Sequence, residues 1–127
     1  MAVIAAAVVI SERGGGDDGG SAESRAARIG TTAAGVCEAR DAAAAGDVPT
    51  ARDRFVDVHG RLHEVADRLA NSERASDVAK AADLLVAKRE VEEVIDEPDP
   101  AHLVERLDQL ASATARADGF GAGESCG

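Results

Sequence analysis

The chain has 127 residues and a formal net charge of −10, and it contains two Phe but neither Trp nor Tyr. This charge excludes a protein that binds nucleic acid through a basic stripe, because Lys and Arg must neutralise the phosphate backbone. The length fits a single small domain, and a hydrophobic content of 45% is that of a folded chain rather than a disordered one.

The chain starts with an apolar run at residues 2–10, followed by the segment GGGDDGG at residues 14–20. A membrane-spanning helix needs about 20 apolar residues, whereas the hydrophobic region of an export signal needs only about 7–15. No Lys or Arg precedes the run, so a buried β-strand or a frayed end is the alternative. We interpret residues 1–20 as a disordered or anchor-like remnant of a signal or membrane anchor with a Gly/Asp tether. We therefore expect an extracytoplasmic protein, either membrane-tethered or secreted.

Apolar residues recur with a helical period from residue 21 onward. This pattern predicts four amphipathic helices, over residues 21–45, 50–70, 73–96 and 100–117. Because short connections force neighbouring helices to run antiparallel, we predict an all-α, up-down-up-down four-helix bundle over residues 21–117. Residues 118–127 form a glycine-rich tail. The core is lean, with 20 Leu, Ile, Val or Phe side chains between residues 21 and 117 and Ala at most other inward positions.

The predicted helix boundaries follow from turn and capping residues. Gly46 and Pro49 separate the first two helices, since Gly ends helices readily and Pro cannot continue the hydrogen-bond ladder. Thr50 is the predicted N-cap of the second helix, with Asp53 as the acid of a capping box. Ser72 is the predicted N-cap of the third helix.

The third predicted helix is apolar on two sides, which suits a helix that touches two neighbours. One side carries Val78, Ala82, Leu85 and Val86. The other carries Leu84, Val91 and Ile95. We assign this second side to assembly with a protein partner or with another copy of the chain.

The two cysteines lie far apart in the sequence, Cys37 late in the first predicted helix and Cys126 in the tail. At a helical rise of about 1.5 Å per residue, the end of the fourth helix lies about 10 Å from Cys37, and the tail is long enough to cross this gap. We predict a Cys37–Cys126 disulfide, which fits an oxidising compartment. Two free thiols, or metal or redox chemistry, are the alternatives.

Two histidines, His59 and His63, are spaced so that both point to one side of the second predicted helix. Such a pair can hold one metal ion if further ligands complete the shell. Glu92 of the third helix, with Glu93 or Cys37 as other candidates, could supply them. The structural alternative is a half-buried His59 bonded to a carboxylate. No cofactor is expected unless this pair binds a divalent metal.

Several charged residues fall on the inward sides of the predicted helices or at one end of the bundle. The predicted polar cluster consists of Arg40, Arg52, Arg89, Glu92, Glu93 and Asp96. It is either an ion-pair network that fixes the register of the helices or a polar pocket for a small ligand.

Three stretches carry a resemblance to a group of proteins. They are Cys37-Glu38-Ala39-Arg40, Phe55…His59…Leu62-His63, and Leu84-Leu85-Val86-Ala87-Lys88 followed by Val91-Glu92. Over residues 21–117 the chain resembles small exported, lipoprotein-like helical proteins of actinobacterial type. The resemblance implies an exported helical bundle and no catalytic residue, although no Cys follows the apolar start as in a lipoprotein.

No triad of Ser, His and Asp, phosphate-binding glycine loop or pair of acids typical of an active site is recognisable. We therefore expect a non-enzymatic extracytoplasmic accessory or interaction protein that binds a protein partner or itself. A metal-binding or metal-handling bundle that uses His59 and His63 is the alternative.

Overall fold

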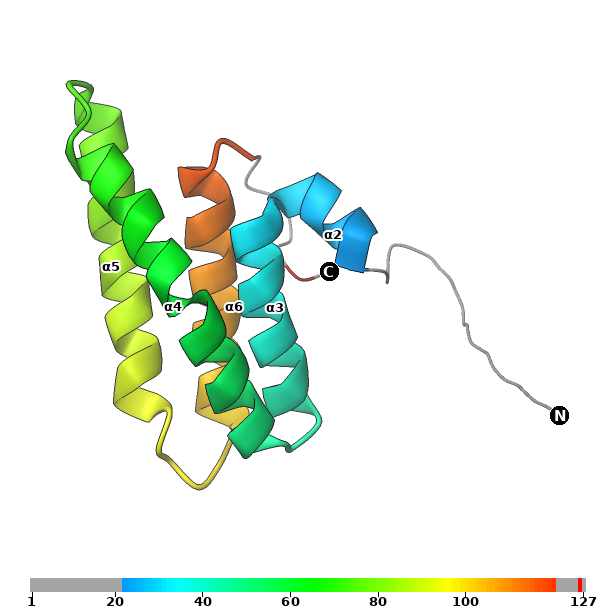
Figure 1. Ribbon diagram of the computed structural model, residues 1–127. Helices are drawn as coiled ribbons and strands as arrows, with labels where there is room; N and C mark the ends of the chain where they lie inside the picture. The colour runs from blue at the N-terminus through cyan, green and yellow to red at the C-terminus, as the bar shows by residue number, and fades with distance from the viewer. Residues whose placement is uncertain (1–21, 121–125, 127) are drawn as a thin grey trace, which may run out of the picture.

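The computed structural model describes residues 22–120 and Cys126, and every regular element in these residues is an α-helix. The helices are α2 (Ala22–Ile29), α3 (Thr31–Ala44), α4 (Val48–Ala70), α5 (Ala75–Val94) and α6 (Ala101–Ala117) (Figure 1). The prediction of an all-α protein is therefore confirmed. The predicted signal or anchor segment at residues 1–20 lies outside the described residues, as does residue 21 and most of the glycine-rich tail (121–125 and 127).

The four longer helices lie side by side, and each packs against two of the others (Figure 1). Helix α3 contacts α4 and α6, and α5 contacts the same two helices, whereas α4 and α6 touch each other much less. The short helix α2 packs against α3. Apolar side chains of the four longer helices therefore share one core.

The prediction of one continuous helix over residues 21–45 is wrong, because Gly30 divides this segment into α2 and α3. Gly30 has a φ of 93°, a left-handed conformation that residues with a Cβ rarely adopt. A Cβ added at Gly30 would lie only 2.8 Å from Cε2 of Phe120. The glycine thus permits both the break in the helix and the close approach of the Phe120 ring.

Helix α4 starts two residues earlier than predicted, and its N-cap is Asp47 rather than Thr50. The Asp47 carboxylate accepts a hydrogen bond from the backbone N–H of Thr50 at 3.2 Å, the interaction expected of an N-cap side chain. Hydrogen bonds from Thr50 hold the pKa of Asp47 below its usual value. Pro49 fits in the first turn, where no intrahelical partner exists for its missing N–H.

Ser72 does not cap α5 directly, since the residue at the N-cap position is Arg74. The Ser72 hydroxyl accepts a hydrogen bond from the Arg74 N–H at 3.1 Å and donates one to Asp77 Oδ2 at 2.7 Å. The hydrogen bond from Ser72 is the main reason that the pKa of Asp77 lies below its usual value. Ser72 therefore stabilises the start of α5, although it lies two residues before the N-cap.

Aliphatic side chains fill the space between the four longer helices. The largest fully buried ones are Leu62, Leu84, Leu103, Leu107, Leu110, Val36, Val58 and Val91. Small residues at the remaining contact positions let the helices approach closely, and a Cβ added at Gly35 of α3 would lie 3.1 Å from Cγ2 of Val58 in α4. The buried hydroxyl of Thr114 donates to the Leu110 carbonyl at 2.7 Å, so it is not left without a partner.

Candidate functional site

The predicted disulfide is present: Cys37 of α3 is bonded to Cys126, across 89 positions of sequence, with a Cα–Cα distance of 5.4 Å. Cys37 is fully buried and Cys126 nearly so. Arg25 of α2 donates to the carbonyl oxygen of Cys126 at 3.2 Å and pairs with Asp41 of α3 at 2.9 Å. The C-terminal cysteine is therefore held by a covalent bond to α3 and by a hydrogen bond to α2.

A polar cluster bridges α4 and α5, and its centre is Lys88, which sequence reasoning did not select. The Lys88 ammonium lies 2.9 Å from Oε2 of Glu92 and 3.5 Å from Nε2 of His59. His59 Nε2 is also 3.4 Å from Glu92 Oε2. The hydrogen bond from Lys88 is the main cause that lowers the pKa of Glu92. Lys88 is the buried cation of α5, where the sequence had suggested Arg89, which is exposed.

The predicted metal site is not supported by this arrangement. His59 and His63 are adjacent, with ring centroids 4.7 Å apart, and Glu92 is close to His59 only. The Lys88 ammonium lies against both His59 and Glu92, so a positive charge already stands where a shared metal ion would be. Within residues 22–120 and Cys126, no three His, Cys, Asp or Glu side chains are grouped to hold a metal ion.

The predicted polar cluster of arginines and acids is divided between separate places. Arg40 pairs with Asp41 at 3.3 Å and with Asp108 of α6 at 3.2 Å. Arg52 of α4 pairs with Asp96 at 3.1 Å, just beyond the end of α5. Arg89 and Glu93 are exposed and belong to neither group. These residues thus form separate links between helices rather than one ligand pocket.

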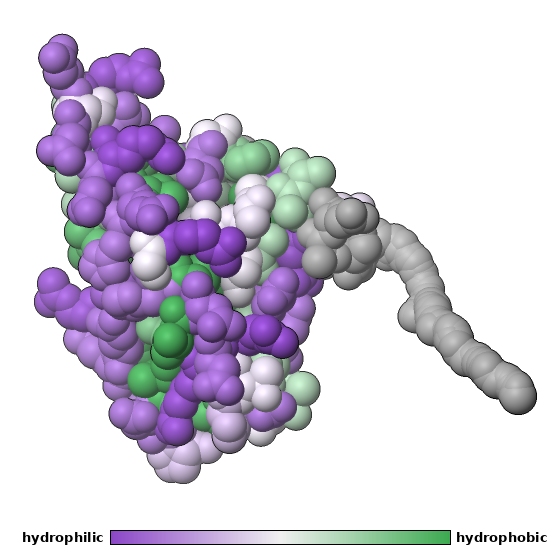
Figure 2. Space-filling view, viewed as in Figure 1, coloured by the Kyte–Doolittle hydropathy of each residue, from purple (hydrophilic) through white to green (hydrophobic). Residues whose placement is uncertain are grey.

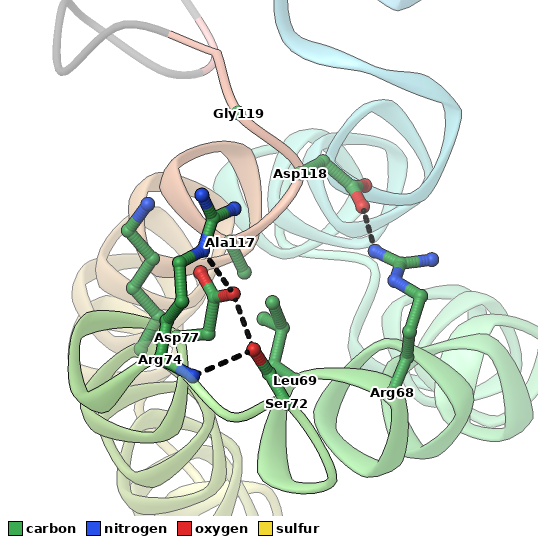
Figure 3. Close-up of a pocket in the computed structure, with 9 residues that line it drawn as sticks. Arg68, Leu69, Ser72, Arg74, Asp77, Ala117, Asp118 and Gly119 are labelled. Atoms are coloured by element: carbon green, nitrogen blue, oxygen red, sulfur yellow. Dashed lines mark hydrogen bonds and ion pairs between the residues drawn. The ribbon is translucent and has the colours of Figure 1, made fainter.

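A hollow of about 410 Å³ lies where α4 ends, α5 begins and α6 ends (Figure 3). Arg68 reaches Asp118 at 3.1 Å on one side of it, and Arg74 reaches Asp77 at 3.3 Å on the other. Lys80 is the fifth charged residue of the lining. Because four of the five charges neutralise each other in pairs, the hollow offers little net charge to a ligand.

The apolar side of α5 that was assigned to assembly is buried in the core and is not exposed to a partner. Leu84 and Val91 are fully buried, and Ile95 is half-buried against the core. The opposite side faces solvent and is called the outer stripe here; it consists of Val78, Ala82, Leu85 and Val86. A helix with two apolar sides can bury either of them, and the packing of α5 against α4 and α6 buries the side that also carries Lys88.

The outer stripe holds three of the four exposed large hydrophobic side chains among the described residues. Val78, Leu85 and Val86 are 43%, 38% and 53% exposed, and the only other exposed large hydrophobic residue among those described is Val56 of α4, at 69%. Green patches stand among polar side chains on the face that carries α4 and α5 (Figure 2). Neither α5 nor any other described helix has the length and apolar content that crossing a membrane requires. The outer stripe is therefore the most prominent candidate surface for contact with another molecule.

Comparison with known proteins adds no family to these observations. No protein-family model matches the chain, and neither a curated protein nor a solved structure matches it. The outer stripe is accordingly interpreted from the burial, contacts and charges of the chain itself.

Proposed function

We propose that the chain is a non-enzymatic, extracytoplasmic interaction protein whose partner docks on the outer stripe of α5. The exposure of three large aliphatic side chains on one helix face carries this proposal. Scattered exposed apolar residues are normal on a protein surface, but neighbouring ones on one face mark interaction sites. Val78, Leu85 and Val86 lie within about two and a half turns of α5, so one partner can cover them together.

We further propose that α3 to α6 form an antiparallel up-down-up-down four-helix bundle that holds the outer stripe rigid. The contacts of α3 and of α5 with both α4 and α6 support this topology. Short connections, such as residues 45–47 between α3 and α4, also favour antiparallel neighbours. The bundle presents α5 with one side in the core and the other available to a partner.

The disulfide supports an extracytoplasmic location for this function. Thiols are kept reduced in most cytosolic proteins, whereas disulfides persist in oxidising compartments. The Cys37–Cys126 bond links α3 to the C-terminal end of the chain across 89 positions. A protein of this size with a lean core gains stability from such a link where it meets no cellular reductant.

Site-specific photo-crosslinking in the native host tests the proposed function. A photoreactive amino acid replaces Leu85 in the outer stripe and, in a separate control, Glu38, which is exposed on α3. The proposal predicts a discrete crosslinked product from position 85 that position 38 does not give. The same products from both positions, or none from position 85, would overturn it.

A further inference from the structure

The side of α4 that points away from the core carries a row of carboxylates. This acidic stripe consists of Asp53, Asp57, Glu64 and Asp67. The spacings of four, seven and three residues keep all four on one side of the helix. Asp57 has a long ion pair with Arg54, at 3.8 Å. The other three form no ion pair with a described residue, so their charge is available to a partner.

The outer stripe and the acidic stripe lie on neighbouring helices, on either side of the seam between α4 and α5. The contacts of Lys88 and Glu92 with His59 identify the sides of α5 and α4 that face each other. At about 100° of rotation per residue, Leu85 follows next after Glu92 toward solvent on α5. On α4, Asp67 lies about 80° further toward solvent than His59, with His63 and Val56 between them. Asp67 is therefore the member of the acidic stripe nearest to the outer stripe, and the other three carboxylates lie on the outward side of α4.

A shallow hollow of about 480 Å³ lies on the surface of α4. It is lined by Thr50, Asp53, Arg54, Val56 and Asp57, so it combines two carboxylates with the exposed Val56 side chain. A long basic side chain carries an apolar stem and a cationic end. The hollow offers such a side chain Val56 for its stem and the carboxylate of Asp53 for its charge, while Arg54 of the same lining pairs with Asp57 at 3.8 Å.

We infer that the partner of the outer stripe is a cationic amphipathic helix of another protein, lying along the seam between α4 and α5. The inference rests on the proposed function and names its partner class. The apolar face of the partner covers Leu85 and its neighbours, while Lys or Arg side chains on its flank meet the acidic stripe. Helices that lay an apolar face in a groove are a common mode of recognition, and complementary charge selects between partners.

A second copy of this chain is a poorer occupant of the same face. Each copy has a net charge of −10, and pairing through this face would bring two acidic stripes toward each other. Like charges placed opposite each other across an interface are unfavourable, and a high net charge keeps proteins monomeric. The charge of the molecule therefore favours a basic partner over self-association.

Binding of a synthetic 18-residue helix, with Leu on one face and Lys on its flanks, tests the inference. The same peptide with Glu in place of every Lys is the control probe. Fluorescence anisotropy at 50 and 300 mM salt measures the Kd for the intact, disulfide-bonded chain. We expect binding of the Lys peptide only, and weaker binding at the higher salt, because salt screens exposed charges.

Three variants separate docking on this face from general attraction to an acidic protein. Leu85→Ser in the outer stripe should raise Kd about three- to tenfold, as contact with a half-exposed Leu is lost. The double variant Glu64→Gln/Asp67→Asn should raise Kd about three- to tenfold as well, because two exposed ion pairs are lost. The matched double variant Glu38→Gln/Glu105→Gln removes two exposed carboxylates of α3 and α6, and it should change Kd less than twofold.

Three outcomes would overturn the inference. They are equal effects of the two double variants, an unchanged Kd for Leu85→Ser, and no binding of the Lys peptide. If the inference fails in one of these ways while position 85 still gives its specific crosslink, the proposed function survives with a partner of different chemistry. A crosslinked product of twice the mass of the chain would identify that partner as a second copy.

Discussion

Arg25 and Cys126 are joined by a hydrogen bond from the guanidinium to the backbone carbonyl, 3.2 Å long, across 101 positions of sequence. The same guanidinium pairs with Asp41 at 2.9 Å, and its side chain is only 15% exposed. Cys126 is thus held by the disulfide to Cys37 of α3 and by the hydrogen bond from Arg25 of α2. Helix α2 therefore contributes a hydrogen bond that holds Cys126 beside α3.

Replacing Arg25 by Ala should make the disulfide easier to reduce. Without this hydrogen bond, Cys126 is held less firmly, and its sulfur and that of Cys37, which are otherwise buried, become accessible to reductant more often. The rate of reduction by dithiothreitol, followed by alkylation and mass spectrometry, should rise several-fold. Arg89→Ala is the control, because it removes an exposed Arg far from the disulfide in sequence; equal rates for the two variants would contradict the role of Arg25.

The variant Cys37→Ser should lower the free energy of unfolding by about 2–5 kcal/mol, because the unfolded chain is no longer restricted by the cross-link. Cys126→Ser and the double variant should cost a similar amount, since all three remove one bond. Guanidinium denaturation of the oxidised proteins measures these differences. A change of less than about 0.5 kcal/mol, the size typical of neutral surface substitutions, would show that the bond contributes little to stability.

Two glycines should respond to Ala in opposite directions. Gly30→Ala should destabilise the protein by about 1–3 kcal/mol, because Gly30 has a positive φ and the new Cβ would meet the Phe120 ring. Gly60→Ala should stabilise it by about 0.5–1 kcal/mol, since Gly60 lies within α4 with open space around it. Thermal unfolding of both variants checks the signs. A stabilising Gly30→Ala would contradict the break between α2 and α3.

His102 should titrate above its ordinary pKa near 6.5, because its Nδ1 lies 2.9 Å from the Glu97 carboxylate, which favours the protonated ring. The folded pKa is the higher one, so the stabilising contribution is full below the unfolded pKa and is lost as pH rises through the folded pKa. Proton NMR titration of the ring resonances measures the shift. In Glu97→Gln the pKa should fall back toward its ordinary value; an unchanged pKa would exclude Glu97 as its cause.

Three of the predicted helices agree with the structure to within about two residues at each end, because their apolar periods are clear and turn residues separate them. The break at Gly30 was missed for a physical reason. A Gly within a helical pattern is tolerated, and the contact that requires it here comes from Phe120, far along the chain. The disulfide could be predicted because the chain has only two cysteines to pair.

The orientation of α5 could not be predicted from periodicity. Its two apolar sides are alike in composition, and the buried one includes Lys88, a residue type that is rarely buried. The Lys88 ammonium reaches Glu92 and His59 at the edge of the core, as long basic side chains commonly do. The residues of the outer stripe were therefore recognised as one apolar side of the helix but were expected to contact a neighbouring helix. The sequence did not single out the acidic stripe of α4, because only the fold shows that α4 packs beside α5.

The most direct test of the central claim is methyl NMR of the intact, oxidised protein titrated with the Leu and Lys peptide. The claim that the outer stripe is the docking face predicts that the methyl resonances of Val78, Leu85 and Val86 shift progressively with added peptide. The methyls of Val104, which is half-buried on α6, should stay in place. Shifts confined to α6, or of equal size on all helices, would contradict it.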